Sequence, residues 1–280
     1  FHVVFSPERV LTGRVFQDLK RYPKLVGGVT EECTKHGVAF YSAFLEFDQR
    51  PDLPRPNGVW AMKNAEAAEF AKVAETTYRD VNIGLANEFA VYAASVDVDI
   101  LEVIEASNSQ PYSHIHSPGI SVGGHCIPVY PRFYMWKNPN AEIVTAARTR
   151  NLDMPLRAIS QIKAEIGNLE NLKVGIFGIT YRAGVKESAF SGALDLLEHL
   201  KANSAIVFGL DPFYNEIEIL KFGFHGLANL SELDGVILHT DHLEFSTLDF
   251  ENFSNLKFLY DGRRSATHLS NSGSFKYLTY

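Results

Sequence analysis

One hydrophobic pattern dominates the first half of the chain. Between Asn64 and Ala94, small and apolar residues recur at helical spacing, with one glycine, Gly84, and no proline. At ~1.5 Å per residue, a helix over this range is about 45 Å long. Because a helix this long and this rich in alanine needs an extensive partner, we interpret it either as the central helix of a helical domain or as a dimer interface.

Shorter apolar runs flank this helix. We predict strands at 2–5 and 23–28 and helices at 30–46 and 97–107. Residues 48–60 hold three prolines and one glycine, and proline cannot continue a helix. We therefore interpret 48–60 as a linker or crossover and place a domain boundary there.

The pattern changes in the second half of the chain. Residues 140–167 predict two helices that are broken near Pro155. From residue 171 onward, short buried runs alternate with a helical segment at 189–201. The buried runs predict strands at 171–182, 204–212, 234–240 and 257–264. Such an alternation indicates an α/β fold with a parallel doubly wound sheet, which binds ligands at the carboxyl ends of its strands.

Composition narrows the choice of partners. Hydrophobic residues make up 46% of the 280 residues and charged residues 21%, which is ordinary for a globular protein. A formal net charge of −7 favours neither a nucleic acid nor an anionic membrane as a partner. No apolar run approaches the roughly 18–20 residues of a membrane span. The two cysteines form neither a disulfide framework nor a zinc signature, so we expect no metal site and a cytoplasmic location.

The second cysteine lies in an unusual setting. Residues 121–132 read SVGGHCIPVYPR, with two glycines before Cys126 and two prolines after it. Cysteine is among the most buried residue types, so one interpretation of Cys126 is packing at a bend. The other is a nucleophile, because glycines let the backbone approach a ligand closely. We expect His125 to shape the loop, and we interpret Cys33, in a helical context, as packing.

Charged residues elsewhere allow two interpretations each. Lys72 and Thr76 share a helical face, and Lys72 is either a solvated surface residue or an oxyanion stabiliser. Glu8 follows a predicted strand, where a carboxylate is either solvated or catalytic. Arg182 and Arg263 each lie at the carboxyl end of a predicted strand segment, together with Tyr181. Two arginines at one sheet edge are suited to a diphosphate, although each alone fits an ordinary surface charge.

Taken together, several segments resemble the UDP-glucose/GDP-mannose dehydrogenase family, and most closely its UDP-N-acetylmannosamine branch. They occur in the family's order across nearly the whole chain. The Gly-Gly-x-Cys loop and the Thr-Tyr-Arg-Asp-Val-Asn-Ile helix are specific, whereas DGRR alone is weak. The segments are SPERVLTG (6–13), EAAEFAKVAETTYRDVNIGLANE (66–88), PGISVGGHCIPVYP (118–131), GITYRAGVKE (178–187) and DGRR (261–264).

The resemblance implies three parts. Residues 1–55 would be the end of an NAD-binding Rossmann domain, 56–165 a helical dimerisation domain, and 166–280 a Rossmann-like domain that binds a UDP-sugar. Phe1 begins a predicted strand, and no strand–Gly-x-Gly-x-x-Gly–helix pattern occurs in the sequence. We therefore expect a preceding segment that carries the NAD loop, and we expect the chain by itself to be inactive.

The resemblance also implies a reaction and its residues. The family oxidises a primary alcohol twice with NAD, giving a carboxylate. Cys126 would form the thiohemiacetal and the thioester, Lys72 would stabilise oxyanions, and Glu8 would act as general base in hydrolysis. The remaining residues implied to contact the substrate are Arg9, Val10, Leu11, Thr76, Gly123, Gly124, Tyr181, Arg182 and Arg263. A UDP-sugar and a second copy of the chain, in a homodimer or larger homo-oligomer, are the expected partners.

Four positions depart from the family pattern. The family usually has Asn at Thr76, Asp at Tyr130, Arg at Ala189 and Arg at Tyr112. We interpret the chain as a nucleotide-sugar 6-dehydrogenase of a distinct branch. The alternatives are an inactive homologue that binds nucleotide sugars or dimerises, and a single-step alcohol dehydrogenase. No residue identifies the sugar.

Overall fold

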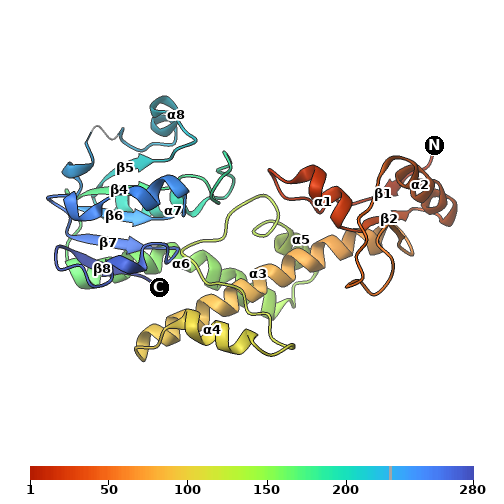
Figure 1. Ribbon diagram of the computed structural model, residues 1–280, viewed down its shortest axis with the longest axis horizontal. Coiled ribbons are helices and arrows are strands. Elements are labelled where there is room, and N and C mark those ends of the chain that lie inside the picture. The colour runs from red at the N-terminus through yellow and green to blue at the C-terminus, as the bar shows by residue number, and fades with distance from the viewer. Residues whose placement is uncertain (227–228) are drawn as a thin grey trace. The chain divides into compact units, whose positions relative to one another are not determined.

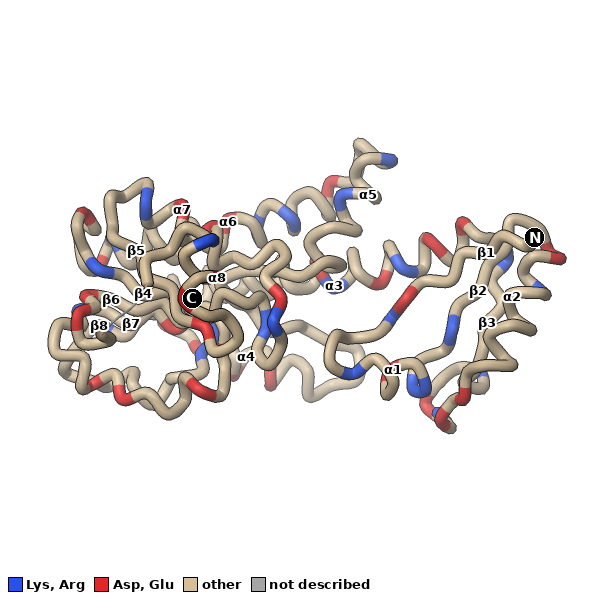
Figure 2. Tube along the Cα trace, turned by 90° about the horizontal axis from the view of Figure 1, so that it is seen from above, with Lys and Arg blue, Asp and Glu red and all other residues tan. Residues whose placement is uncertain are grey.

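The computed structural model describes residues 1–226 and 229–280, and the chain forms two compact units (Figure 1). The first unit comprises residues 1–77 and the second residues 78–280. Basic and acidic residues are interspersed along the chain rather than gathered in one segment (Figure 2). No helix among the described residues is both long and apolar enough to cross a membrane.

A small mixed sheet forms the first unit. Its order is β1-β2-β3, with β1 antiparallel and β3 parallel to the central strand β2. The strands are β1 (Val4–Phe5), β2 (Lys24–Gly28) and β3 (Val59–Ala61), and the helices are α1 (Val15–Arg21) and α2 (Glu31–Phe44). At Gly37 of α2, a Cβ would lie 2.8 Å from the side chains of both Val4 and Val26. Glycine is required there because α2 packs directly on the sheet.

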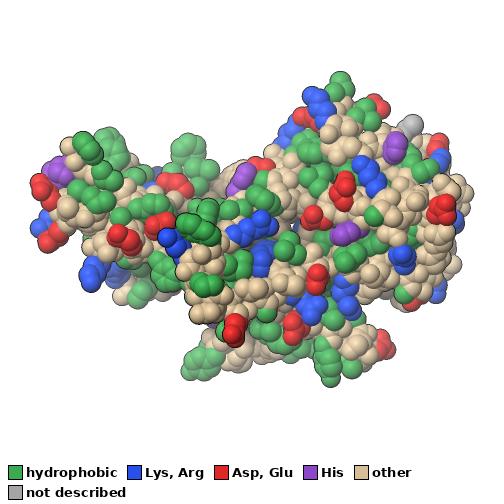
Figure 3. Space-filling model, turned by 180° about the vertical axis from the view of Figure 1, so that it is seen from behind, with side chains coloured by type: hydrophobic (Ala, Val, Ile, Leu, Met, Phe, Trp, Pro, Cys, Tyr) green, Lys and Arg blue, Asp and Glu red, His purple; other side chains and the backbone are tan. Residues whose placement is uncertain are grey.

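The long helix α3 (Ala65–Ser95) confirms the helix predicted from residue 64 to residue 94. Within the second unit, α3 packs on α6 (Glu142–Ile166), where a Cβ on Gly84 would lie 2.9 Å from Ala147. Two shorter helices accompany them, α4 (Ile100–Asn108) and α5 (Tyr130–Lys137). Several large apolar side chains of α3 are exposed, among them Phe70 at 56% and Tyr92 at 68%. Hydrophobic side chains reach the surface in several places on the face drawn in Figure 3.

The structure contradicts one prediction about a proline-containing segment and decides another. Residues 142–166 form one helix that contains Pro155, not two helices. Proline removes one backbone hydrogen bond, but Met154, Ala158 and Ile159 are buried on both sides of that point and hold the helix together. The segment 48–60 leads from α2 into β3, and it thereby completes the crossover between the parallel strands β2 and β3, which is one of the two interpretations made from the sequence.

The second unit contains the predicted parallel sheet, in the order β5-β4-β6-β7-β8 (Figure 1). Its elements are β4 (Lys173–Phe177), α7 (Gly192–Ala202), β5 (Ile206–Leu210), α8 (Glu216–Lys221), β6 (Gly235–Leu238), β7 (Phe258–Asp261) and β8 (Lys276–Leu278). The chain moves from β4 to one side and then returns to the other side at β6. This reversal places the expected ligand crevice at the carboxyl ends of β4 and β6.

Both faces of this sheet are covered. On one face, α6 and α7 contribute Ile159, Ile162, Leu196 and Leu200 to the core. On the other face, short 3-10 turns contribute aromatic side chains, namely Phe245, Phe250 and Phe253. These two hydrophobic layers fix the strand ends that carry the candidate site.

Candidate functional site

Cys126 lies on a loop just before α5, with a partly exposed free thiol. Its backbone carbonyl accepts hydrogen bonds from Val129 N at 3.2 Å and Tyr130 N at 3.0 Å. These bonds begin α5, and Pro131 suits the first turn of a helix because it has no N–H to leave unpaired. The other cysteine, Cys33, is only 7% exposed. Of the two thiols, Cys126 is therefore the accessible one.

Two glycines hold the loop that runs from Gly119 to Cys126, here called the cysteine loop, against the sheet domain, which comprises β4 to β8 and their helices. A Cβ on Gly123 would lie 2.5 Å from Tyr181 Cβ and 2.9 Å from Phe190 O. Gly124 has φ +96°, a conformation that favours glycine, and its N–H donates to Ala189 O at 2.8 Å. The structure thus gives both glycines a packing reason, in addition to the ligand approach that the sequence suggests.

The imidazole of His125 pairs with a carboxylate of the sheet domain. Its Nε2 lies 3.0 Å from Glu187 Oε2. The pKa of Glu187 is lowered, first by the N–H of Ala189 and then by His125. This ion pair ties the cysteine loop to the segment that follows β4, as expected for a loop-shaping residue.

Arg263 and Tyr181 meet at the carboxyl edge of the sheet. The Arg263 guanidinium donates from Nε to His239 O at 2.9 Å and from Nη2 to Tyr181 O at 3.4 Å. A Cβ on Gly119 would lie 3.1 Å from Arg263 Nη1, so the cysteine loop begins beside this guanidinium. Arg182 follows Tyr181 and is half-buried. Three of the residues expected at the diphosphate are therefore gathered at one edge.

Sequence reasoning missed the buried polar groups that shape this edge. Asp211 Oδ2 accepts from Ile179 N at 2.7 Å and Thr180 N at 2.9 Å, and His242 Nε2 lies 2.7 Å from Thr180 Oγ1. Burial alone would raise the pKa of Asp211, but hydrogen bonds from His242, Thr180 and Phe213 outweigh it and lower the pKa. The one available signal was an Asp-Pro pair at the carboxyl end of the strand predicted at 204–212.

In the first unit, Glu75 joins two residues expected at the substrate. Its carboxylate lies 2.8 Å from Arg9 Nε and 3.4 Å from Lys72 Nζ. Lys72 is only 7% exposed, so its interpretation as a solvated surface residue is wrong. Thr76 is 3% exposed and donates its hydroxyl to Lys72 O at 2.8 Å, within its own helix.

The segment after β1 is held by a second set of contacts. Glu8 forms an ion pair with Lys24 and keeps 61% of its side chain exposed. Leu11 N donates to Asp18 Oδ2 at 2.9 Å, and Val10 lines a small hollow with Glu8. Glu8 and Lys72 thus belong to the first unit, whereas Cys126 belongs to the second.

The other departures from the family pattern have defined places. Tyr130 is the first residue of α5, and its ring meets that of Phe133 edge-on at 5.9 Å. Tyr112 is 93% exposed on the loop after α4. Ala189 contributes its carbonyl to Gly124. None of these three side chains carries a charge that would replace the family's Asp or Arg.

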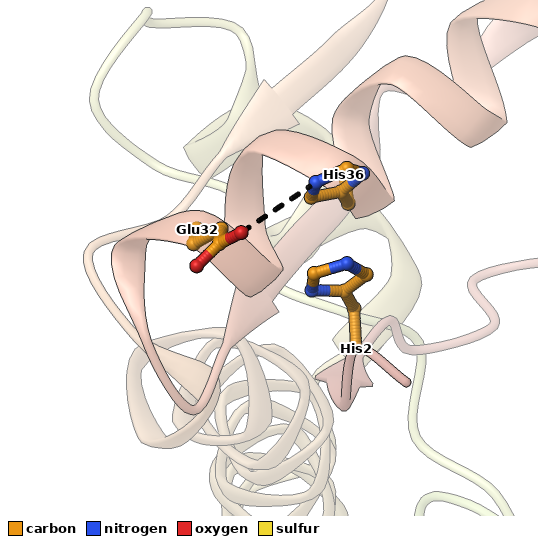
Figure 4. A group of neighbouring side chains, drawn as sticks. All are labelled: His2, Glu32 and His36. Carbon is orange, nitrogen blue, oxygen red and sulfur yellow. Dashed lines mark ion pairs between the residues drawn. The ribbon is translucent and has the colours of Figure 1, made fainter.

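One group of potential metal ligands is brought together away from these residues. His2, Glu32 and His36 are exposed, and their ligand atoms lie within 4.8 Å of one another (Figure 4). The imidazole rings are stacked, with centroids 3.7 Å apart and an interplanar angle of 14°. Lone pairs in nearly parallel rings do not converge on one point, so we assign no metal to this group.

Comparison with known proteins identifies two regions. Residues 66–153 match the central domain of the UDP-glucose/GDP-mannose dehydrogenase family, and residues 175–268 match the UDP binding domain of that family. The boundaries predicted at residues 55 and 165 stay a prediction.

Similar proteins are found among archaea and bacteria. A UDP-N-acetyl-D-mannosamine dehydrogenase of Methanococcus aeolicus is 32% identical over 258 residues, which are 91% of this chain and 56% of that protein. One of Pyrococcus horikoshii is 33% identical over 275 residues, covering 94% and 61%. The chain thus spans about 56–61% of the length of these relatives.

Solved structures of similar proteins superpose on nearly the whole chain. A UDP-D-ManNAc dehydrogenase structure from Pyrococcus horikoshii superposes with a TM-score of 0.84 at 28% identity, covering 99% of this chain and 65% of that one. A UDP-N-acetyl-mannosamine dehydrogenase from Staphylococcus aureus gives 0.78 at 31%, covering 100% and 64%. The fold predicted from the sequence is thereby confirmed.

Proposed function

This chain belongs to the UDP-glucose/GDP-mannose dehydrogenase family, and on that premise we propose that it functions as a nucleotide-sugar 6-dehydrogenase of the UDP-N-acetylmannosamine type. The reaction would oxidise the C6 alcohol of the sugar to an aldehyde and then to a carboxylate. Each oxidation removes a hydride, for which NAD is the acceptor in the family. No strand–Gly-x-Gly-x-x-Gly–helix pattern occurs in the 280 residues, so we place no NAD contact on this chain.

The observation that carries the proposal is the loop that joins Arg263 to Cys126. The loop starts beside the Arg263 guanidinium at Gly119, and Ile120 N donates to Gly262 O at 3.3 Å. It ends at a partly exposed thiol. A guanidinium suits the diphosphate of a nucleotide sugar, and a thiol seven residues further along suits its reacting carbon. Tyr181 and Arg182 extend the same edge.

On this proposal, Cys126 adds to the C6 aldehyde as a thiolate and forms a thiohemiacetal. Loss of a second hydride from C6 gives a thioester, and water then cleaves the C–S bond to release the carboxylate and the thiol. Lys72 supplies the cation that stabilises the oxyanions, and its low exposure reduces the screening of that cation by water. Glu8 takes the proton of the attacking water. Arg9, Val10 and Leu11 hold the sugar, with Thr76, Gly123 and Gly124.

A second candidate function rests on Tyr130 and Thr76. At Tyr130 a phenol replaces the family's carboxylate, and the Thr76 hydroxyl already bonds within its helix. A protein with these features would bind nucleotide sugars without oxidising them. We also propose that the chain dimerises through α3, because Phe70, Tyr78 and Tyr92 leave apolar surface exposed.

The test is a count of NADH formed per sugar by the full-length protein, with UDP-N-acetylmannosamine and excess NAD. Two NADH per sugar, abolished in Cys126→Ala and kept in Cys33→Ala, support the proposal. Sugar binding without NADH identifies the inactive homologue. One NADH per sugar, with Cys126→Ala still active, identifies a single-step alcohol dehydrogenase. A panel of UDP-glucose, UDP-N-acetylglucosamine and UDP-N-acetylmannosamine then identifies the sugar.

A further inference from the structure

A buried histidine connects the cysteine loop to the nucleotide edge of the sheet. His239 follows β6 directly and is 0% exposed. Its Nδ1 lies 2.8 Å from Gly178 O, at the end of β4, and its Nε2 lies 2.8 Å from Ser121 Oγ, on the cysteine loop. The ring therefore bridges three segments that are distant in the sequence.

The contacts of the ring determine its protonation. A carbonyl oxygen only accepts, so Nδ1 carries the proton and donates it to Gly178 O. Burial lowers the pKa of His239 to about 3, which keeps the imidazole neutral. Nε2 then has a free lone pair and accepts from the Ser121 hydroxyl. The Ser121–His239 bond therefore has one direction, and it persists at every pH near neutrality.

The same residue also holds the arginine expected at the diphosphate. The backbone carbonyl of His239 accepts from Arg263 Nε at 2.9 Å. One residue thus contacts Arg263 through its main chain and Ser121 through its side chain. Ser121 lies five residues before Cys126 on a loop that the glycines press against the sheet domain.

The Ser121–His239 hydrogen bond is one of several contacts that hold the loop, together with those of Gly124 and His125. Ser121 is wedged against α7, since a Cβ on Gly192 would lie 2.1 Å from Ser121 Cβ. A cavity of about 310 Å³ is lined by Ser121, Val122 and Pro128. On the side of this cavity, no packed side chains among the described residues support the loop. Loss of the Ser121–His239 hydrogen bond would therefore leave the loop room to shift into the cavity.

We propose that His239 is a positioning residue that couples occupancy of Arg263 by a nucleoside diphosphate to the placement of Cys126. The inference deepens the proposed function and rests on it. A diphosphate at Arg263 competes with the His239 carbonyl for the guanidinium. The resulting shift at the end of β6 reaches the cysteine loop through the Ser121 hydroxyl.

Three variants separate the parts of this contact. His239→Asn retains an amide N–H near the position of Nδ1 but is too short to accept from Ser121. His239→Gln reaches the position of Nε2 with its carbonyl oxygen and retains an acceptor. Ser121→Ala removes the donor. His268→Asn is the matched control, because His268 is exposed and lies outside this network.

The test measures the alkylation rate of Cys126 by iodoacetamide in the full-length protein, with and without UDP, using peptide mass spectrometry to assign the label to Cys126. Isothermal titration with UDP and a thermal melt accompany each variant. In the unmodified protein, we expect UDP to change the rate at least threefold. In His239→Asn and Ser121→Ala, we expect the alkylation rate without UDP to rise at least threefold. We expect the response of this rate to UDP to disappear. The dissociation constant of UDP should change less than threefold. His239→Gln and the control stay within twofold of the unmodified protein.

The outcomes distinguish the two proposals. If UDP does not bind the unmodified protein, the nucleotide site of the proposed function is wrong. If UDP binds but the folded variants keep both the rate and its response to UDP, the positioning role of His239 is overturned. If a variant melts far below the unmodified protein, the result is taken from His239→Gln instead. A response of the Cys126 alkylation rate to UDP that is retained in His239→Gln supports the positioning role. Loss of that response in folded His239→Gln contradicts it.

Discussion

Arg148 donates a hydrogen bond from Nη1 to Asp80 Oδ1 at 2.6 Å, and this pair connects α6 to α3 inside the second unit. Arg148 is 4% exposed and Asp80 is 0% exposed. Asn151 adds a donor to the same oxygen at 2.8 Å. Burial lowers the pKa of Arg148 and raises that of Asp80, so each charge depends on the other for its stabilisation.

Removing one member of this pair is expected to be costly. Arg148→Met leaves a buried carboxylate without its cation, and we expect the free energy of unfolding to fall by about 3–5 kcal/mol. Urea denaturation followed by circular dichroism measures the change. The double variant Asp80→Leu with Arg148→Met removes both charges and should recover most of the loss. A single variant that costs less than about 1 kcal/mol contradicts the interpretation.

A second prediction concerns Glu75, which lies between Arg9 and Lys72. Glu75→Gln removes the carboxylate that holds the Lys72 ammonium in place. If Lys72 stabilises an oxyanion, the resulting displacement should lower kcat roughly tenfold to a hundredfold. Steady-state kinetics of NADH formation measure the effect. Glu69→Gln is the matched control, because Glu69 lies on the same helix and is exposed. Equal rates for the two variants would show that Glu75 has no part in placing Lys72.

A third prediction compares neighbouring arginines. Arg263 contacts His239 O and Tyr181 O at the sheet edge, whereas Arg264 forms a bidentate pair with Asp99 at 2.8 and 2.9 Å. Lysine cannot reproduce a guanidinium that donates in two directions, so Arg263→Lys should weaken UDP binding roughly tenfold. Arg264→Lys should leave UDP binding within about threefold. Isothermal titration with UDP measures both affinities. A larger loss of UDP affinity in Arg264→Lys than in Arg263→Lys would place the diphosphate elsewhere.

The elements that the sequence predicted are those with a strong hydrophobic period. The helix α3 and the strands β4, β5, β6 and β7 have long apolar repeats or buried runs, so their type follows from local pattern. The three-residue strands β3 and β8 were missed, since three residues do not establish a period. Pro155 was read as a break because its buried neighbours on α6, which offset the lost hydrogen bond, belong to tertiary packing.

The candidate site likewise contains residues that the sequence predicted and residues that only the structure revealed. Cys126 and the glycines were found because their spacing is local and unusual. The bonds of His239 join residues 118 and 61 positions apart, and the bond between Asp211 and Thr180 spans 31. No periodicity marks such a network, because each partner is supplied by the strand order of the sheet. Buried polar networks of this kind therefore become visible only in the folded chain.

The last prediction concerns acid stability. Burial lowers the pKa of His239 to about 3, whereas a histidine in the unfolded chain titrates near 6.5. Below pH 6.5 the unfolded state binds a proton that the folded state does not, so the free energy of unfolding falls as pH falls, until pH approaches 3. The slope is about 1.4 kcal/mol per pH unit. The lowered pKa of Asp211 adds a loss in the same direction, below its ordinary value of 3.8.

Replacing His239 by Gln should therefore remove one source of acid sensitivity. Between pH 7 and pH 5 we expect the unmodified protein to lose about 2 kcal/mol more than His239→Gln, because only its unfolded state has the extra histidine that takes up a proton in that range. Urea denaturation at the two pH values measures the difference, and the other histidines, which are common to both proteins, cancel. His268→Asn serves as the control, since an exposed histidine should leave the loss unchanged. Parallel losses in the unmodified protein and His239→Gln would mean that His239 takes up a proton in the folded state above pH 5, and the lowered pKa assigned to it would then be wrong.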